Sequence, residues 1–313
     1  MEPMRLIFAG TPDVALPSLQ ALVDAGHQIV LVVTQPDARG KRGRALHPSP
    51  VKVRAQELGL AVATPEKASD PAFVDHVRSL EADAAAVVAY GQILRPALLE
   101  ATRLGWVNLH FSVLPAWRGA APVQRAIQAG DDVTGASTFL IEAGLDTGPV
   151  IGQATERIRP TDTAGDLLAR LAEVGAPLLK DSLEALDGGY AAPMPQTEDG
   201  VSHAAKLTRE DASIRWDLPA LVVDRAIRAC TPAPGAWTTL PDGSTAKVGP
   251  VTLEDGPGTT PGLLRGDGDG VTVGTGTSPV RLSWIQPAGK SAMDASDWWR
   301  GARWGESAQL GEA

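Results

Sequence analysis

Short apolar strands alternate with helical patterns through the first half of this chain, and this order constrains the fold more than any other feature. The expected strands are apolar or β-branched stretches at residues 5–9, 29–34 and 83–89, and a strand-like stretch at 105–110 that carries polar residues at its far end. The expected helices lie between them, at residues 16–22, 51–58 and 71–80. This alternation predicts an α/β domain with a Rossmann-like, mostly parallel sheet. Ligands of such sheets collect at the carboxyl ends of the strands.

The pattern changes in the second half of the chain. Residues 136–142 and 150–157 flank a tight AGLDTGP segment and predict an antiparallel extension of the sheet, followed by a long helix over 163–186. After another helix at 218–230, short strand patterns broken by glycine and proline predict a small β-barrel.

These changes of texture suggest where the domains divide. A stretch rich in proline, alanine and polar residues, 191–206, is the best linker candidate. We therefore expect a first domain over 1–190 and a smaller, β-rich domain over 207–313.

The formal net charge of −9 argues against a general nucleic-acid binder, because phosphate backbones require local positive charge. One loop departs from this acidic background. Between Asp37 and Glu57 there is no acid, and the cations are Arg39, Lys41, Arg42, Arg44, Lys52 and Arg54. The four within residues 39–44 are spaced by glycine, and such a finger can grip phosphates or enter a groove. Taken alone, a merely solvated charged loop explains them equally well.

Several classes of site and location are disfavoured. Gly10 follows the first strand, but AGTPDV lacks the other glycines of GxGxxG, so NAD binding is not expected. No HExxH, paired CxxC or P-loop occurs, and we expect no metal. Cys230 is the only cysteine and lies in an apolar stretch, which suggests an inert thiol in a reducing compartment. With no membrane-length apolar run and no signal-peptide pattern, we expect a cytoplasmic monomer that does not contact a membrane.

The stretch VNLHFSVLPAWRGAAP carries the candidate chemistry. Asn108 and His110 are two residues apart on a predicted strand, so their side chains share a face near its carboxyl end. An isolated pair would be explained as polar residues that end a strand. Similarly, Asp146 in LDTGP would alone be an ordinary turn residue.

In combination, the NxH pair, the SxLPxxRGxAP segment from Ser112 and the DTGP loop from Asp146 resemble the folate-dependent formyltransferases. This family includes glycinamide ribonucleotide transformylase, sugar formyltransferases and methionyl-tRNA formyltransferases. The resemblance is strong because separated elements occur in the family's order, and it is most specific between residues 6 and 160. It implies formyl transfer from 10-formyltetrahydrofolate as co-substrate, without a metal.

The resemblance also implies roles for individual residues. Asn108, His110 and Asp146 match the catalytic trio. The backbone that holds the tetrahydrofolate is matched by Ser112, Val113, Leu114 and Pro115. Attack of an amine on the formyl carbon produces an oxyanion, to which Asn108 and His110 can donate hydrogen bonds. Asp146 is suited to moving the amine proton and to orienting His110.

The basic loop bears on the acceptor. It resembles the loop that methionyl-tRNA formyltransferases insert after their second strand, and its closing segment HPSPVK matches well. The implied acceptor is charged initiator tRNA, contacted by Arg39, Lys41, Arg42 and Arg44. The C-terminal region, from Lys206 and again at PAPGA, resembles the OB-fold-like tRNA-binding domain of these enzymes. That region has 11 basic and 13 acidic residues, so tRNA contact there requires a local basic face.

Three alternatives remain open at this point. A sugar or small-amine formyltransferase would use the same trio but should lack HPSPVK. A formyltetrahydrofolate hydrolase keeps the trio, uses water as acceptor and usually has an additional N-terminal regulatory domain. A catalytically silent tRNA-binding protein would have no need of the intact trio.

Overall fold

The computed structural model describes residues 2–39, 46–267, 270–305 and 307–311. The chain forms two compact units, each assembled from three stretches. The first unit comprises Met1–Gly119, Val133–Arg157 and Leu168–Ala204. The second comprises Ala120–Asp132, Ile158–Leu167 and Ala205–Ala313. Because the chain passes between the units more than once, this division does not test the expected boundaries at 190 and 206. They stay a prediction.

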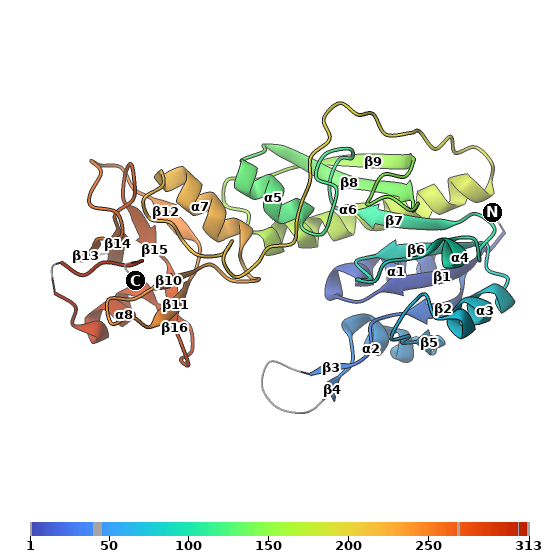
Figure 1. The fold of residues 1–313 in the computed structure, drawn as a ribbon, viewed down its shortest axis with the longest axis horizontal. Coiled ribbons are helices and arrows are strands. Elements are labelled where there is room, and N and C mark those ends of the chain that lie inside the picture. The colour runs from blue at the N-terminus through green and yellow to red at the C-terminus, as the bar shows by residue number, and fades with distance from the viewer. Residues whose placement is uncertain (1, 40–45, 268–269, 306, 312–313) are drawn as a thin grey trace. The chain divides into compact units, whose positions relative to one another are not determined.

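A seven-stranded sheet is the centre of the first unit, in the order β5-β2-β1-β6-β7-β8-β9 (Figure 1). Its strands are β1 (Arg5–Gly10), β2 (Gln28–Val33), β5 (Val62–Ala63), β6 (Ala84–Val88), β7 (Trp106–His110), β8 (Val133–Leu140) and β9 (Val150–Arg157). The strands from β5 to β7 pair in parallel, whereas β8 and β9 are antiparallel to their neighbours. The predicted mostly parallel sheet with an antiparallel extension is therefore confirmed.

Helices cover both faces of this sheet. They are the 3-10 helix η1 (Asp13–Ala15), α1 (Leu16–Asp24), α2 (Pro50–Glu57), α3 (Pro71–Ser79), α4 (Pro96–Leu99) and α6 (Ala164–Asp187). On one face, Ile7, Ala85 and Trp106 join the apolar side chains of α3 and α4 in one buried cluster. On the other, Leu109 packs so closely on α6 that a Cβ added to Gly175 would lie 2.7 Å from it. Burial on both faces explains why the central strands β1, β2 and β6 are almost continuously apolar.

The second unit is built on two four-stranded antiparallel sheets. One sheet contains β10 (Trp237–Thr239), β11 (Thr245–Val248), β16 (Trp284–Pro287) and β17 (Met293–Asp294). The other contains β12 (Val251–Leu253), β15 (Val280–Leu282), β14 (Gly270–Val273) and β13 (Leu264–Asp267). The helices are α5 (Pro122–Ala129), α7 (Ala220–Ala229) and α8 (Ala295–Ala302). The expected small β-rich domain is confirmed, and its strands pair in antiparallel fashion.

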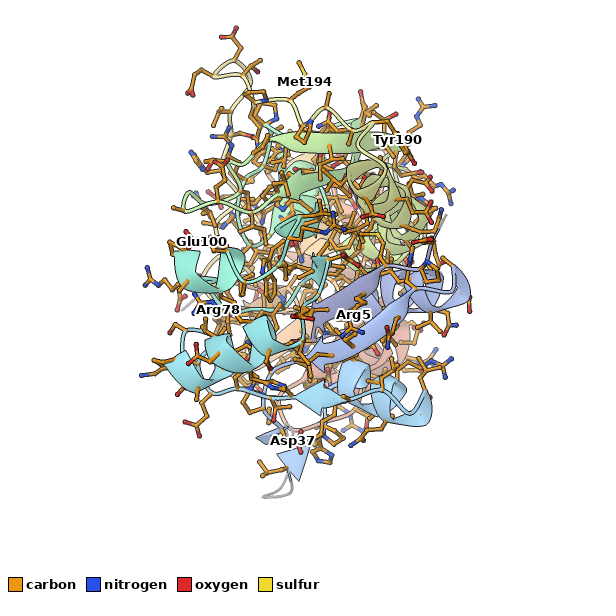
Figure 2. The ribbon with its side chains drawn as sticks, turned by 90° about the vertical axis from the view of Figure 1, so that its right-hand side faces the viewer. Arg5, Asp37, Arg78, Glu100, Tyr190 and Met194 are labelled. Atoms are coloured by element: carbon orange, nitrogen blue, oxygen red, sulfur yellow. The ribbon has the colours of Figure 1, made fainter. Side chains whose placement is uncertain are left out.

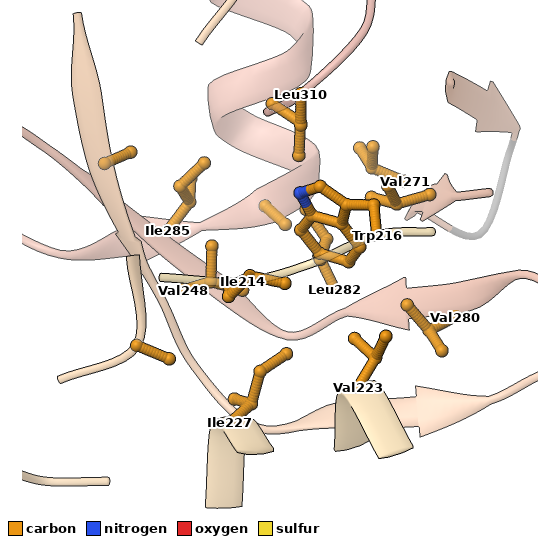
Figure 3. Close-up of a cluster of buried hydrophobic side chains, with 14 of the residues drawn as sticks. Ile214, Trp216, Val223, Ile227, Val248, Val271, Val280, Leu282, Ile285 and Leu310 are labelled. Atoms are coloured by element: carbon orange, nitrogen blue, oxygen red, sulfur yellow. The ribbon is translucent and has the colours of Figure 1, made fainter. Parts of the chain in front are cut away.

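One buried cluster joins the two sheets of this unit (Figure 3). Val248 and Ile285 come from one sheet and Leu282 from the other, and Trp216 packs among them. The indole N–H of Trp216 donates to the hydroxyl of Thr238 at 2.9 Å, so its polar atom is satisfied within the core. In the part of the chain that the structure describes, no helix is long and apolar enough to cross a membrane.

Candidate active site

Strand β7 directs the first two residues of the predicted trio. Because Leu109 points to α6, its neighbours Asn108 and His110 point to the opposite face. Asn108 is half-buried, next to Val87 of β6 and opposite Phe139 of β8. Among the described residues its amide has no hydrogen-bond partner, so its N–H groups are available as donors.

His110 is the last residue of β7 and is only 5% exposed. Its Nε2 lies 2.9 Å from the carbonyl oxygen of Trp117, and its Nδ1 lies 3.7 Å from Oδ2 of Asp146. A carbonyl oxygen can only accept, so we assign the proton of the neutral ring to Nε2, and Nδ1 faces the carboxylate.

Burial is the largest influence on the charge of His110. It lowers the pKa of the imidazole below its usual value, and the Asp146 carboxylate and the Trp117 carbonyl offset this only in part. The ring is therefore neutral at pH 7. A proton taken up at Nδ1 would create an imidazolium between a carboxylate and a carbonyl oxygen, both of which stabilise it.

Asp146 reaches His110 from the loop between β8 and β9. Its Oδ2 accepts the backbone N–H of Gly119 at 2.7 Å, and its side chain is 17% exposed. Its backbone is left-handed, with φ of +52°. This conformation is uncommon for residues other than glycine, although aspartate tolerates it better than most. Gly148 is needed in the same loop because a Cβ there would collide with the carbonyl oxygen of Leu140.

Residues 112–115, the predicted folate segment, follow His110 directly and have a fixed shape. Ser137 of β8 accepts the N–H of Leu114 at 3.0 Å and donates to the carbonyl of Ser112 at 2.7 Å. Gln153 of β9 donates to the carbonyl of Leu114 at 2.8 Å and to Ser137 at 3.0 Å. Several backbone groups of Ser112 to Pro115 are thus already engaged by the sheet. Val113 and Pro115 are the half-buried members of the segment.

A second group of residues around the trio was missed by the sequence analysis. Gln196 donates from its amide to the carbonyls of Asp146 and Gly148, both at 2.8 Å. Ser202 accepts the N–H of Trp117 at 2.8 Å. Both belong to the stretch interpreted as a linker. We call residues 194–204 the strap. Its composition signals only a loop, so nothing in the sequence distinguishes these two polar residues from their neighbours.

The predicted tRNA loop can be described only at its base. The side chain of Arg39, the last residue of β3 (Ala38–Arg39), lies outside the described residues, as do Lys41, Arg42 and Arg44 entirely. β3 pairs with β4 (Leu46–His47). Figure 2 shows Asp37, which precedes β3, at the margin of the first unit opposite Met194.

The closing segment HPSPVK fastens this base to the first unit. Ser49 caps α2 by accepting the N–H of Lys52 at 3.0 Å, and its hydroxyl lies 2.7 Å from that of Thr34. The Lys52 ammonium pairs with Asp37 at 2.7 Å. Arg54 pairs with Glu57 at 2.9 Å. Lys52 and Arg54, the two of the six cations whose side chains are described, therefore both have acidic partners beside the loop.

No group of three or more His, Cys, Asp or Glu side chains in the described ranges is placed to hold a metal ion. The polar groups next to His110 are instead the Asp146 carboxylate and the Trp117 carbonyl, and the Asn108 amide lies on the same face of β7. Such a site can donate hydrogen bonds to a developing oxyanion and move a proton.

Comparison with known proteins places the chain among formyltransferases. The family model described as "Formyl transferase" matches residues 4–183, and "Formyl transferase, C-terminal domain" matches residues 206–303. The curated "Methionyl-tRNA formyltransferase" of Thermobifida fusca is 56% identical over 310 residues, covering 99% of this chain and 100% of that protein. Other relatives with the same name share 52 to 57% of their residues with this chain.

Solved structures share the fold at much lower identity. HypX from Aquifex aeolicus in complex with tetrahydrofolic acid has a TM-score of 0.69 at 15% identity, covering 95% of this chain and 47% of that one. The sugar 3N-formyl transferase WlaRD has a TM-score of 0.65 at 19% identity, covering 93% of this chain and 100% of that one. The family model spans more than half of the chain and the curated relatives match it almost end to end, so this chain belongs to the formyl transferase family.

Proposed function

We propose that this chain transfers a formyl group from 10-formyltetrahydrofolate to the amino group of methionine carried by the initiator tRNA. The observation that carries the proposal is the identity of 52 to 57%, over nearly the whole chain, with relatives named methionyl-tRNA formyltransferase. The reaction serves translation initiation, and we place it in the cytoplasm, performed by a monomer.

The proposed chemistry needs no covalent intermediate with the enzyme. The methionine nitrogen forms a bond to the formyl carbon, the bond from that carbon to folate N10 breaks, and the amine proton moves to N10. The tetrahedral oxyanion formed on the way requires donors. We assign this role first to the amide of Asn108, because its N–H groups have no other partner in the described chain. One such donor typically contributes about 3–4 kcal/mol to lowering the barrier.

His110 and Asp146 are assigned to the proton and to the second donor. The Asp146 carboxylate can take the amine proton directly or through a water molecule, and it lies 3.7 Å from Nδ1 of His110. Protonation of the imidazole at Nδ1 leaves Nε2–H as a stronger, charge-assisted donor. In this structure that N–H points to the carbonyl of Trp117, so donation to the oxyanion requires it to be shared or redirected.

The folate assignment rests on position. Residues 112–115 leave the carboxyl end of β7, where ligands of parallel sheets bind, and the side chains of Ser137 and Gln153 hold them in one conformation. We propose that this preformed segment, with Val113 and Pro115 only half-buried, lines the folate site. Preorganisation of this kind lowers the entropic cost of binding.

The tRNA assignment rests on the basic loop. We propose that Arg39, Lys41, Arg42 and Arg44 contact tRNA phosphates. Each neutralised phosphate releases counterions, so log affinity falls with log salt by ~0.7–0.9 per contact. Arg42→Ala should therefore weaken tRNA binding and flatten the salt slope by about one contact, with folate affinity unchanged. Lys52→Ala is the matched control, since that cation already pairs with Asp37. An unchanged slope in Arg42→Ala contradicts the loop assignment.

The acceptor is tested by offering several amines to one enzyme. Purified protein with 10-formyltetrahydrofolate should formylate methionyl initiator tRNA much faster than a dTDP-linked amino sugar or glycinamide ribonucleotide. A faster reaction with the amino sugar would favour the sugar formyltransferase alternative. Release of free formate without any acceptor would favour a hydrolase.

A further inference from the structure

We infer that the strap, residues 194–204, is part of the catalytic apparatus and holds Asp146 and the Trp117 carbonyl in register with His110, with Gln196 as the positioning residue for Asp146. The activity part of this inference rests on the proposed formyl transfer. The geometric part does not, because it concerns hydrogen bonds within the first unit.

The strap is fastened at both ends by backbone hydrogen bonds. At its start, Met194 and Val150 of β9 exchange two bonds, each of 2.8 Å. At its end, Arg118 donates to the carbonyl of Ser202 at 2.9 Å and accepts from the N–H of Ala204 at 2.7 Å. Between these two anchors the strap runs past the loops that carry Trp117 and Asp146. Because both of its ends are fixed, it cannot move as a flexible linker would.

Gln196 lies between these anchors and bonds the Asp146 loop directly. Its amide nitrogen donates to the carbonyls of Asp146 and Gly148, both at 2.8 Å. Both N–H hydrogens of one amide group thus hold two carbonyls of the same turn. Asp146 has a positive φ of +52°, a conformation that persists only where the surroundings enforce it. Gln196 provides part of that enforcement.

The same side chain reaches the other loop through Arg118. The amide oxygen of Gln196 accepts from Nε of Arg118 at 2.9 Å, and Arg118 is only 8% exposed. Next to it, Gly119 donates its N–H to Asp146. A Cβ on Gly119 would lie 2.7 Å from the carbonyl oxygen of Ala204, so the strap backbone is in close contact with this loop.

Both polar groups that contact His110 are therefore held by the strap. The Trp117 carbonyl belongs to a residue whose N–H is bound by Ser202, and Asp146 belongs to a turn bound by Gln196. In the described part of the chain, the imidazole itself forms no hydrogen bond or ion pair with the strap. Its alignment depends on the two loops, and a displacement of about 1 Å in a catalytic group can cost 10²-fold in rate.

Three variants separate positioning from general support. Gln196→Ala removes both donors and the acceptor for Arg118. Gln196→Glu keeps an acceptor for Arg118 but has no N–H for the carbonyls of Asp146 and Gly148. The matched control is Gln286→Ala, which removes a glutamine whose amide donates to a single backbone carbonyl, that of Lys290, at 3.0 Å in the second unit.

We expect Gln196→Ala and Gln196→Glu each to lower kcat for methionyl-tRNA by about 10- to 100-fold, since two partly buried hydrogen bonds to the turn are lost. The KM for the folate should change less than about threefold, because residues 112–115 are held by Ser137 and Gln153 instead. Gln286→Ala should behave as wild type. If Gln196→Ala does not fold, Gln196→Glu gives the answer, because its pairing with Arg118 retains one of the strap's contacts.

A second readout needs no activity. The Gly119 N–H is protected by its hydrogen bond to Asp146, whose turn is held by Gln196. Hydrogen exchange at Gly119, followed by NMR, should therefore be faster in both Gln196 variants and unchanged in Gln286→Ala. A wild-type protein that formylates no tRNA would overturn the proposed function and leave this test intact. Wild-type kcat and unchanged Gly119 exchange in Gln196→Glu would overturn the positioning role.

Discussion

Replacing Asp146 with asparagine tests the electrostatic core of the site. In the native chain the Gly119 N–H donates to Oδ2 of Asp146 at 2.7 Å. The asparagine oxygen can still accept this hydrogen bond, so the loop keeps it. What disappears is a negative charge 3.7 Å from Nδ1 of His110. Because that charge offsets part of the effect of burial, the pKa of His110 should fall further below its usual value in Asp146→Asn.

The size of the effect follows from the distance. Two unit charges about 4 Å apart attract by about 4 kcal/mol at an effective dielectric constant of about 20. That energy corresponds to roughly 10³ in the stability of the imidazolium, since about 1.4 kcal/mol is tenfold. Asparagine is neutral and avoids the cost of burying a carboxylate, which offsets part of this loss. We therefore expect kcat to fall by about 10²–10³-fold.

The assay combines kinetics with titration. Single-turnover formylation of methionyl-tRNA gives the rate of the chemical step, NMR titration gives the pKa of His110, and a thermal melt gives Tm. We expect a slow enzyme, a lower pKa for His110 and a Tm within a few degrees of wild type. A rate within tenfold of wild type, or a His110 pKa that rises, would refute the charge-pair role. A variant that does not fold would mean that Asp146 is chiefly a structural turn residue.

Three further predictions concern single residues. Asn108→Ala should lower kcat by about 10²–10³-fold with little change in the KM of either substrate, because an oxyanion donor acts in the transition state. A kcat within threefold of wild type would show that Asn108 does not have this role. Gly119→Ala should cost about 1–3 kcal/mol of stability and lower the Tm in a thermal melt. The reason is that φ of Gly119 is +125° and an added Cβ would lie 2.7 Å from the carbonyl oxygen of Ala204. An unchanged Tm would show that the strap moves aside freely. Burial raises the pKa of the Cys230 thiol to about 11, so alkylation at pH 8 should require denaturant, and rapid labelling of the native protein would contradict its burial.

The main elements of the fold could be predicted because the long helices show a period and the central strands are apolar runs. The helix expected at 163–186 is Ala164–Asp187 in the structure, and the helix expected at 218–230 is Ala220–Ala229. Two-residue strands such as β5 (Val62–Ala63) have no period to detect, and β5 exists because its backbone pairs with β2. These short elements depend on pairing within the sheet, so the local sequence could not predict them.

The candidate site divides in the same way. Asn108, His110 and Asp146 stand in recognisable motifs, and the structure brings His110 and Asp146 within 3.7 Å of each other, with Asn108 on the same face of β7 as His110. Gln196 and Ser202 stand in no motif. Their partners lie 50 and 85 positions away along the chain, so their contribution depends on tertiary contacts that no local pattern encodes.

The central claim is the movement of the formyl group itself. Enzyme, 10-formyltetrahydrofolate labelled in the formyl carbon, and one equivalent of methionyl initiator tRNA are mixed for a single turnover, and the tRNA is then deacylated. We predict that the label is recovered as N-formylmethionine, and that uncharged initiator tRNA and charged elongator methionine tRNA receive little of it. Label that remains on the folate, or that is recovered as free formate, would contradict the proposed function.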